Sequence, residues 1–347
     1  MPAATPASLG YRWPAEWEPH AATWLAWPHN AETWPERLEP AIEGFVAIVR
    51  ELHAREPVRI LVGDERMEES ARRRLAAAGV EVDRVGFERI PTNDAWARDF
   101  GPIFLVRDAE REPSRRRALV DFGFDCWGRK YAPWDLDDAA PRRIAGRLGL
   151  RRFAADFVLE GGSVDGNGRG TVLTTESCLL NPNRGAGRSR ESMERRLATW
   201  LGATQVVWLG EGIAGDDTDG HVDDVARFVA PGTVVAAVGS DANAAALAEN
   251  LRRLRAARDQ EGKPLDVLSL PMPPAHRVDG LLCPASYANF YLANGVALVP
   301  VFGVAEDAPA LALLRDVLPG RDVVGIPCAD LVCGLGAVHC LTQQEPA

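Results

Sequence analysis

The sequence has no long apolar run, no CxxC pair and no excess of positive charge, and each absence excludes a class of protein. No stretch approaches the roughly 20 apolar residues of a membrane span, and residues 1–19 lack the basic start and apolar core of a secretory signal. A net charge of −10 argues against a nucleic-acid-binding protein, whose contact face would be basic. We therefore expect a cytoplasmic protein that contacts neither membranes nor nucleic acids.

The absence of nucleotide-binding motifs and of metal-ligand spacings argues against a bound cofactor. The six cysteines are scattered without CxxC spacing, which predicts free thiols rather than a disulfide framework. No GxGxxG or Walker sequence indicates nucleotide binding. Residues 165–176 imitate a calcium loop, but Arg169 stands at a ligand position and the flanks are typical of strands. No spacing supports zinc on His221, Asp223 and Cys340, so we expect neither a metal nor an organic cofactor.

Apolar periodicity predicts alternating helices and strands. Between Leu38 and Leu52 apolar residues recur at spacings of 4, 3, 4 and 3, which places them on one face of a helix. A strand is expected over Val58–Val62, and the same order then recurs. Further helices are expected over Met67–Ala78, Leu136–Leu148, Ser189–Leu201, Asp241–Arg258 and Asp307–Leu318, and a charged loop over Ala109–Arg117.

Three hairpin turns recur at a regular interval. They centre on Gly166, Gly232 and Gly295, 66 and 63 residues apart, and 347 residues divided by five is about 69. This period predicts an α/β fold of about five units of hairpin, helix and strand around an axis. Two ordinary α/β domains are the alternative, but no Pro/Gly/Ser-rich linker or charge block divides the chain. We therefore expect one domain over residues 1–347, with the Trp-rich residues 1–36 packed on its body or against another subunit.

The densest polar cluster is Gly215–Asp224, which runs into the apolar segment Val225–Ala230. If the backbone is extended there, His221 and Asp223 point to the same side, because strand side chains alternate. An imidazole beside a carboxylate is the pair that general acid–base catalysis uses. The alternative is a solvated acidic loop with a capping histidine.

Cys340 is the second candidate, at the end of a glycine-rich approach. Glycines let the backbone come close to a ligand, and a thiol at the start of a short strand there is a candidate nucleophile. His339 would face the other side of that strand, so His221 is the better candidate for its base. The alternative is that Cys340 is a small buried apolar residue.

Two acids precede predicted hairpins. Asp99 lies in the polar segment Asn93–Pro102, and Glu160 ends an apolar run just before two glycines. A carboxylate in an apolar strand is costly unless it is paired or used. The structural alternative for Glu160 is therefore a buried ion pair, with Arg98 or Arg184 as its partner.

The spacing of the four candidates follows the repeat. Asp99 and Glu160 are 61 residues apart, as are Glu160 and His221. Cys340 follows His221 by 119 residues, close to two periods. One polar group per unit, at equivalent positions, would converge at the axis of the repeats.

In these motifs the chain resembles the agmatine deiminases, which belong with the bacterial-type peptidylarginine deiminases among guanidino-group-modifying enzymes. The resemblance runs from about Trp13 to Pro346, in order along the chain. It rests on Trp13–His20, Trp24–Asn30, Asn93–Pro102, Trp127–Tyr131, Leu159–Ser163, Asp219–Asp223, Ser286–Tyr291 and His339–Gln344.

The resemblance implies the pentein fold, a five-bladed α/β propeller with a central active site. It implies hydrolysis of agmatine to N-carbamoylputrescine and ammonia in putrescine synthesis, by a homodimer without cofactor. Cys340 matches the nucleophile and His221 the general acid–base group. The residues matching the catalytic carboxylates and the substrate-binding positions are Asp99, Glu160 and Asp223, followed by Asp94, Trp96, Trp127 and Asp217.

Four residues depart from the usual pattern of these motifs. Leu335 and Ala337 stand in the approach to Cys340, where more glycine is expected, and Cys126 and Arg129 flank Trp127. An inward-pointing Arg129 would repel the amine of agmatine, which keeps arginine in peptides as the alternative substrate. Two other classes stay open: a guanidine-binding protein without turnover, and a Cys/His peptidase.

Overall fold

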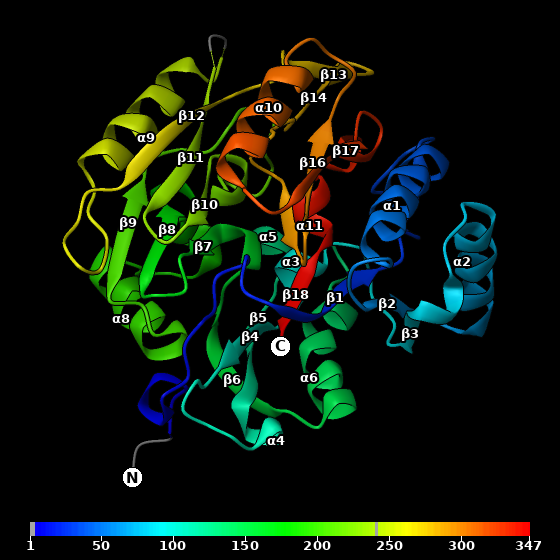
Figure 1. Cartoon of the computed structure of the whole chain (residues 1–347), viewed down its shortest axis with the longest axis horizontal. Helices are drawn as coiled ribbons and strands as arrows, with labels where there is room; N and C mark the ends of the chain where they lie inside the picture. The colour runs from blue at the N-terminus through cyan, green and yellow to red at the C-terminus, as the bar shows by residue number, and fades with distance from the viewer. Residues whose placement is uncertain (1–3, 240–241) are drawn as a thin grey trace.

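The computed structural model describes residues 4–239 and 242–347. Within these residues the strands form one four-stranded, four three-stranded and one two-stranded sheet. The larger sheets are arranged around a common centre, with helices on the outside (Figure 1). No helix among the described residues is long and apolar enough to cross a membrane.

Four units share one topology. An antiparallel hairpin is followed by an outer helix and by a third strand, parallel to the second. The units comprise β4 (Ile103–Val106), β5 (Arg117–Gly123), α6 (Asp135–Leu148) and β6 (Arg151–Val158); β7 (Val164–Gly166), β8 (Thr171–Thr175), α8 (Arg190–Leu201) and β9 (Gln205–Leu209); β10 (Ala226–Ala230), β11 (Thr233–Val238), α9 (Ala244–Ala256) and β12 (Asp266–Pro271); and β15 (Tyr291–Ala293), β16 (Val296–Val301), α10 (Asp307–Val317) and β17 (Asp322–Pro327).

The fifth unit is made from both ends of the chain. Its first strand is β18 (Gln343–Pro346), which pairs antiparallel with β1 (His20–Ala26). The unit continues through α1 (Leu38–Leu52) to β2 (Val58–Val62), and then adds α2 (Glu65–Ala77) and β3 (Val85–Arg89). The chain therefore forms the fivefold α/β propeller that the repeat period predicts.

The long helices lie where their apolar periodicity places them. The apolar face of α1 is buried, and Phe45, Ile48 and Leu52 have no exposed surface. The prediction of a helix over Asp241–Arg258 is met by α9, although Asp241 lies outside the described residues. Trp24 and Trp34, from the N-terminal segment, are buried in the same core as α1.

The short elements differ from the predictions. The charged segment 109–117 contains the helix α4 (Pro113–Arg116) and the first residue of β5. A hairpin of β13 (His276–Val278) and β14 (Leu281–Cys283), which no sequence pattern predicted, follows β12. Other short elements are η1 (Ala7–Leu9), η2 (Val82–Arg84), α3 (Ala97–Phe100), α5 (Cys126–Arg129), η3 (Gly161–Ser163), α7 (Glu176–Leu179), η4 (Pro182–Arg184), η5 (Val222–Asp224), η6 (Leu331–Gly334) and α11 (Val338–Leu341).

Two predicted strand segments are helical turns. Val222–Asp224 forms the 3₁₀ turn η5, and Cys340 lies in the helix α11 rather than at the start of a strand. The strand β18 begins only at Gln343. Both corrections have the same cause, since each segment turns at the centre of the propeller before its strand begins.

Candidate active site

Each predicted catalytic residue lies just before the first strand of its unit. Asp99 precedes β4, Glu160 precedes β7, and His221 and Asp223 precede β10. Cys340 precedes β18 in the same way. All five are buried. The predicted catalytic residues of different units are therefore spaced by about one repeat, or two, because each lies at the equivalent position, before the first strand of its unit.

Asn289 fills this place in the unit of β15, β16 and β17, ahead of β15; it lies in the motif Ser286–Tyr291 but was not predicted as a site residue. Its Nδ2 lies 3.1 Å from Cys340 Sγ and 3.0 Å from Asp224 Oδ1. It follows His221 by 68 residues, so the repeat could have indicated it. An amide is neither charged nor nucleophilic, and for this reason Asn289 was missed.

Gly162 shows how closely the acidic groups and the imidazole meet. A Cβ on this residue would lie 2.6 Å from His221 Nδ1 and 2.9 Å from Oδ1 of Asp99. It would also lie 2.9 Å from Oδ2 of Asp223. Three functional atoms thus surround one point that only glycine leaves open, which brings together the imidazole and two carboxylates.

His221 is a neutral base without a bound partner. Neither ring nitrogen has a hydrogen-bond partner among the described residues, and Nδ1 lies 3.7 Å from Asp99 Oδ1. Burial and the nearby Arg184 guanidinium hold the pKa of His221 well below its usual range. A neutral imidazole with free nitrogens can accept one proton and later donate it.

Asp99 and Asp223 do not ionise easily in the ligand-free protein. Asp99 accepts hydrogen bonds from Gly162 N at 2.9 Å and Trp127 Nε1 at 3.0 Å. Burial, followed by the charge of Glu160, nevertheless raises the pKa of Asp99 to about 7. Burial and the charge of Asp99 likewise raise the pKa of Asp223. A cation entering the site would reverse both effects.

Glu160 takes part in a buried ion pair, and its partner is Arg184. Arg184 Nε lies 2.8 Å from Glu160 Oε1, and its other nitrogens contact Asp219 and the carbonyl oxygen of Thr218. The alternative of a buried ion pair with Arg184 is therefore confirmed for Glu160, which also lies close to His221. Arg98 points elsewhere, to Gln344 and Glu16.

Cys340 lies at the inner end of a cavity of about 760 Å³. Its Sγ is 3.8 Å from Asp223 Oδ2. Burial is the main cause that raises the pKa of the thiol, and the neighbouring acids Asp223 and Asp224 oppose a thiolate further, so Cys340 is protonated in the ligand-free protein. A Cβ on Gly336 would lie 2.5 Å from the Trp96 ring and 3.1 Å from Cys340 Cβ, so glycine is required in this approach.

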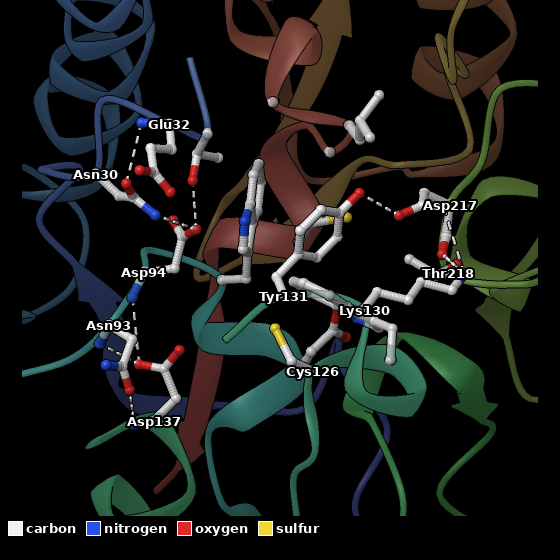
Figure 2. Close-up of a pocket in the computed structure, with 18 of the residues that line it drawn as sticks. Asn30, Glu32, Asn93, Asp94, Cys126, Lys130, Tyr131, Asp137, Asp217 and Thr218 are labelled. Atoms are coloured by element: carbon white, nitrogen blue, oxygen red, sulfur yellow. Dashed lines mark hydrogen bonds and ion pairs between the residues drawn. The ribbon is translucent and has the colours of Figure 1, made fainter. Parts of the chain in front are cut away.

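Five of the seven predicted substrate-binding residues line this cavity, whereas Glu160 and Asp223 do not. Trp96 and Trp127 form part of its wall. Asp94 lies on one side, where it accepts a hydrogen bond from Thr33 at 2.5 Å. Asp217 lies on the opposite side, bonded to Tyr131 (Figure 2). Asp99 and Cys340 line the cavity, whereas His221, Glu160 and Asp223 do not.

Trp127 is presented by a left-handed turn. Cys126, Trp127, Gly128 and Arg129 have φ of 56°, 56°, 87° and 67°. Non-glycine residues in this region cost roughly 1–2 kcal/mol each. Asp125 offsets part of this cost, because its side chain accepts a hydrogen bond from Gly128 N at 3.0 Å. The turn orients the Trp127 indole toward Asp99.

Arg129 and Leu335, two residues that depart from the motifs of the family, do not displace the predicted catalytic residues. Arg129 is exposed and is not among the residues lining the cavity, so it does not repel a substrate amine. Leu335 adopts the left-handed conformation, with φ of 70°, in which glycine is more common. Its neighbour Gly336 keeps the contact with Trp96 open.

The described residues include one group that could hold a metal ion, with ligand atoms of Glu160, Cys178 and His221 within 4.8 Å of one another. The Arg184 guanidinium already contacts Glu160, and this positive charge opposes a metal cation. In the segment 165–176, which imitates a calcium loop, the first acid, Asp165, already forms an ion pair with Arg227 at 2.5 Å.

A fivefold propeller with a buried thiol, imidazole and carboxylates at its centre defines a pentein-type hydrolase acting on C–N bonds of guanidino groups. A family model described as Porphyromonas-type peptidyl-arginine deiminase matches residues 12–346, and the chain belongs to that family. An agmatine deiminase of Stutzerimonas stutzeri is 37% identical, over 99% of this chain and 98% of its own.

Two solved structures extend this similarity to three dimensions. An agmatine deiminase of Enterococcus faecalis is 33% identical with a TM-score of 0.91, over 100% of this chain and 98% of its own. A cysteine-to-serine variant of the C. jejuni agmatine deiminase, with substrate bound, is 28% identical with a TM-score of 0.84, over 96% of each chain.

Proposed function

We propose that this protein is a cysteine-dependent guanidine deiminase that hydrolyses agmatine to N-carbamoylputrescine and ammonia. The observation that carries the proposal is the convergence of a buried thiol, an imidazole and carboxylates, of which Cys340 and Asp99 line one acidic cavity. The relatives named agmatine deiminases support it over the full length of the chain.

The buried carboxylates suit a guanidinium, which is planar and always charged. Asp99 and Asp223 face the same point from two elements, and Glu160 lies close to His221. Carboxylates accept paired N–H bonds from such a cation, and the indoles of Trp96 and Trp127 offer flat faces beside it. A bound cation also lowers the pKa of each neighbouring acid.

The first half-reaction forms a covalent intermediate. Neutral His221 accepts the proton of the Cys340 thiol, and the substrate cation stabilises the resulting thiolate. Sγ attacks the guanidinium carbon, and the bond from this carbon to one terminal nitrogen breaks. His221 returns its proton to this nitrogen, which leaves as ammonia. A thiouronium then links Cys340 to the substrate.

The second half-reaction consumes one water. His221 takes a proton from the water as its oxygen attacks the thiouronium carbon. The carbon–sulfur bond breaks, the thiolate leaves, and His221 reprotonates Sγ. The product carbon then loses its hydroxyl proton to form the carbonyl, and ammonia takes up this proton. The sum is therefore the guanidinium and water giving the ureido group and ammonium, with Cys340 and His221 regenerated.

The charge of the cavity favours agmatine over free arginine. Glu32, Asp94 and Asp217 are among its acidic lining residues, whereas His29 and Lys130 are its basic side chains among the described residues. Lys130 is already held by Asp217 and Asp219, at 3.3 and 3.0 Å. An α-carboxylate would therefore find little free positive charge, while the second amine of agmatine meets carboxylates.

Incubation with agmatine, free arginine and arginyl peptides tests the proposal, with ureido product and ammonia assayed together. We expect ammonia and one ureido group per agmatine, and little turnover of arginine. Cys340→Ala should lose activity by at least about a thousandfold, as expected for removal of a nucleophile. The control Cys328→Ala removes another buried thiol that does not line the cavity.

The outcomes separate the alternatives. Turnover of peptides in preference to agmatine would assign the peptidylarginine reaction. Agmatine binding without product would indicate a binding protein, and cleavage of a peptide bond would indicate a peptidase. Full activity in Cys340→Ala would contradict the mechanism.

We further propose a cytoplasmic homodimer that serves putrescine synthesis. This part rests on the family resemblance, because Trp24 and Trp34 are buried within their own chain and offer no surface to a partner. Sedimentation at micromolar concentration should give twice the chain mass of 37.6 kDa. A single species of 37.6 kDa would contradict the dimer.

A further inference from the structure

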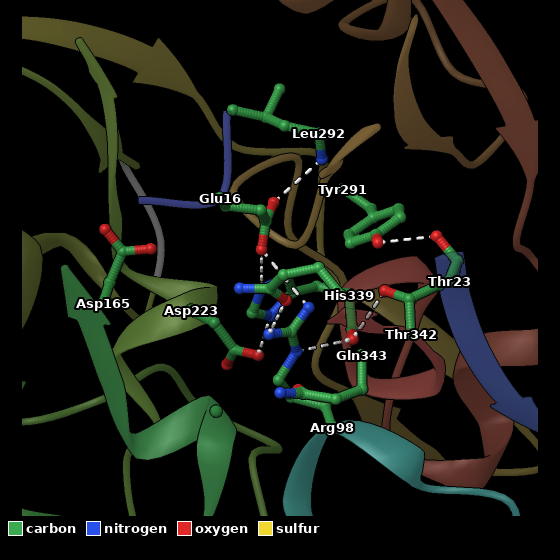
Figure 3. A network of polar contacts seen from close by, with 12 residues as sticks. Glu16, Thr23, Arg98, Asp165, Asp223, Tyr291, Leu292, His339, Thr342 and Gln343 are labelled. Carbon is green, nitrogen blue, oxygen red and sulfur yellow. Dashed lines mark hydrogen bonds and ion pairs between the residues drawn. The ribbon is translucent and has the colours of Figure 1, made fainter. Parts of the chain in front are cut away.

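A chain of buried hydrogen bonds extends from Asp223 to the N-terminal segment (Figure 3). His339 Nδ1 lies 2.6 Å from Asp223 Oδ2, and His339 Nε2 lies 2.8 Å from Glu16 Oε2. Neither His339 nor Glu16 lines the cavity, and the proposed reaction assigns them no step. Our inference about these two residues rests on the proposed guanidine substrate.

Glu16 can only accept hydrogen bonds. Its Oε1 accepts from Arg227 Nη2 and from the backbone N–H of Leu292, both at 2.8 Å, and Oε2 is 3.2 Å from Arg98 Nη2. Burial opposes ionisation, but Arg227 and His339 hold the pKa of Glu16 well below its usual range. Because an ionised Glu16 has no proton to donate, His339 Nε2 carries the proton of their shared bond.

The bond between His339 Nδ1 and Asp223 Oδ2 holds its proton at one end or the other. In the ligand-free protein burial and Asp99 raise the pKa of Asp223, and burial lowers the pKa of His339. Both effects place the proton on Asp223. The charged or titratable groups around Asp223 are Arg98 and Asp99 on α3, Asp216 and His221 before η5, Asp224 on η5, Arg227 on β10, and His339 and Cys340 on α11.

We infer that His339 and Glu16 are positioning residues that hold the proton of Asp223 while a guanidinium is bound. The arriving cation favours the carboxylate form of Asp223. The O–H bond at Asp223 Oδ2 breaks and an N–H bond forms at His339 Nδ1. The imidazolium then lies between two carboxylates, those of Asp223 and Glu16.

This transfer lets a buried acid change its charge without exchanging a proton with water. The ligand-free protein avoids an ionised Asp223 beside Asp99 and Asp224, which would repel it. The substrate-bound protein supplies the carboxylate that the cation needs. When the product leaves, the proton returns to Asp223.

Counting the protons released on agmatine binding tests the transfer. Calorimetric titrations in buffers of different ionisation enthalpy give this number in a Cys340→Ser background, which blocks turnover. His339→Asn keeps a hydrogen-bonding group near the Nδ1 position but cannot hold the proton. By linkage, it should release about one proton more per agmatine below pH 7 than the control His276→Asn, whose ring contacts the Ala329 carbonyl oxygen. Equal counts would overturn the inference.

A second variant covers the case in which His339→Asn fails to fold. Glu16→Gln preserves size and leaves an oxygen acceptor, but provides no anion beside an imidazolium. Agmatine affinity should fall about tenfold or more at pH 6 and far less at pH 8, where Asp223 loses its proton to water more readily. An equal loss at both pH values would show a merely structural role and would count against the inference.

The protonation of His339 in the ligand-free protein can be read without any substrate. Nitrogen-15 NMR of Cys340→Ser, with His339 assigned through His339→Asn, should show a neutral ring protonated at Nε2 near pH 7. An imidazolium in the ligand-free protein would overturn the inference. If agmatine binds none of the variants, the proposed function fails, while this measurement still decides the state of His339.

Discussion

The titratable residues of this site favour their neutral forms in the ligand-free protein, and a cationic substrate favours the ionised forms of the acids. Asp99 has a pKa of about 7, Asp223 and Cys340 have raised pKa values, and His221 is neutral. Burial is the main cause in each case. A guanidinium compensates the three acidic groups together, so binding and activation of the nucleophile are coupled.

Trp127→Phe should move the pH dependence of agmatine binding upward. Asp99 must be ionised to bind the cation, so affinity rises with pH through about 7. Trp127 Nε1 stabilises the ionised form by its 3.0 Å bond to Asp99 Oδ2. Removing a hydrogen bond worth about 1 kcal/mol raises the pKa of Asp99 by roughly 0.7 unit, which shifts the rising limb to higher pH.

Binding of agmatine to Cys340→Ser, measured from pH 5 to 9, gives this limb directly. Trp134→Phe is the matched control, because Trp134 is partly buried and makes no contact with Asp99. An unchanged midpoint in Trp127→Phe, or an equal shift in the control, would contradict the role of the indole N–H.

At the scale of elements, the sequence predicts the long helices and strands, which follow from local apolar periodicity. It does not predict the short turns at the centre of the propeller, whose conformation depends on contacts between distant residues. The helix Leu38–Leu52 follows from its apolar face, and its ends agree with the structure. Cys340 was expected on a strand, but it lies in a four-residue helix whose geometry depends on distant contacts, including Asn289. The contact between Glu16 and His339 was missed because the two residues are far apart in sequence.

The turn α5 is the element whose conformation most directly positions a cavity residue. A Cβ on Gly128 would lie 2.6 Å from Asn183 Cγ, at a φ of 87°. Gly128→Ala should therefore lower the free energy of unfolding by about 1–2 kcal/mol and weaken agmatine binding by moving Trp127. Urea unfolding and substrate titration measure the two effects separately.

Gly146→Ala is the opposite case in the same unit. Gly146 lies within α6, and a Cβ added to it would meet no neighbouring atom within 4 Å, so alanine should stabilise by up to about 1 kcal/mol. Equal effects of the two substitutions would show that the left-handed turn is not a constraint.

At the scale of the whole molecule, the propeller is closed by its two chain ends. The pairing of β1 with β18 completes the fifth unit, with Trp24 opposite Gln343. Cys340 lies in α11, directly before β18, so the nucleophile belongs to the closing segment. The repeat period predicted five units, but it could not show that one of them combines residues more than 300 positions apart.

Glu345→Gln should weaken this closure. Glu345 is buried, accepts a 2.8 Å hydrogen bond from Trp24 Nε1 on β1, and pairs with Arg117 on β5 at 2.5 Å. Loss of its charge leaves Arg117 without this buried partner, which should cost about 2–4 kcal/mol of unfolding free energy. Because the contact joins the closing strand to two other strands, activity and tryptophan fluorescence should be lost together, at a lower urea concentration than in the unsubstituted protein.

Glu39→Gln is the control, because it removes an exposed partner of Arg74. It should change the free energy of unfolding by less than about 0.5 kcal/mol. Similar losses in the two variants would show that the chain-end contact does not control closure.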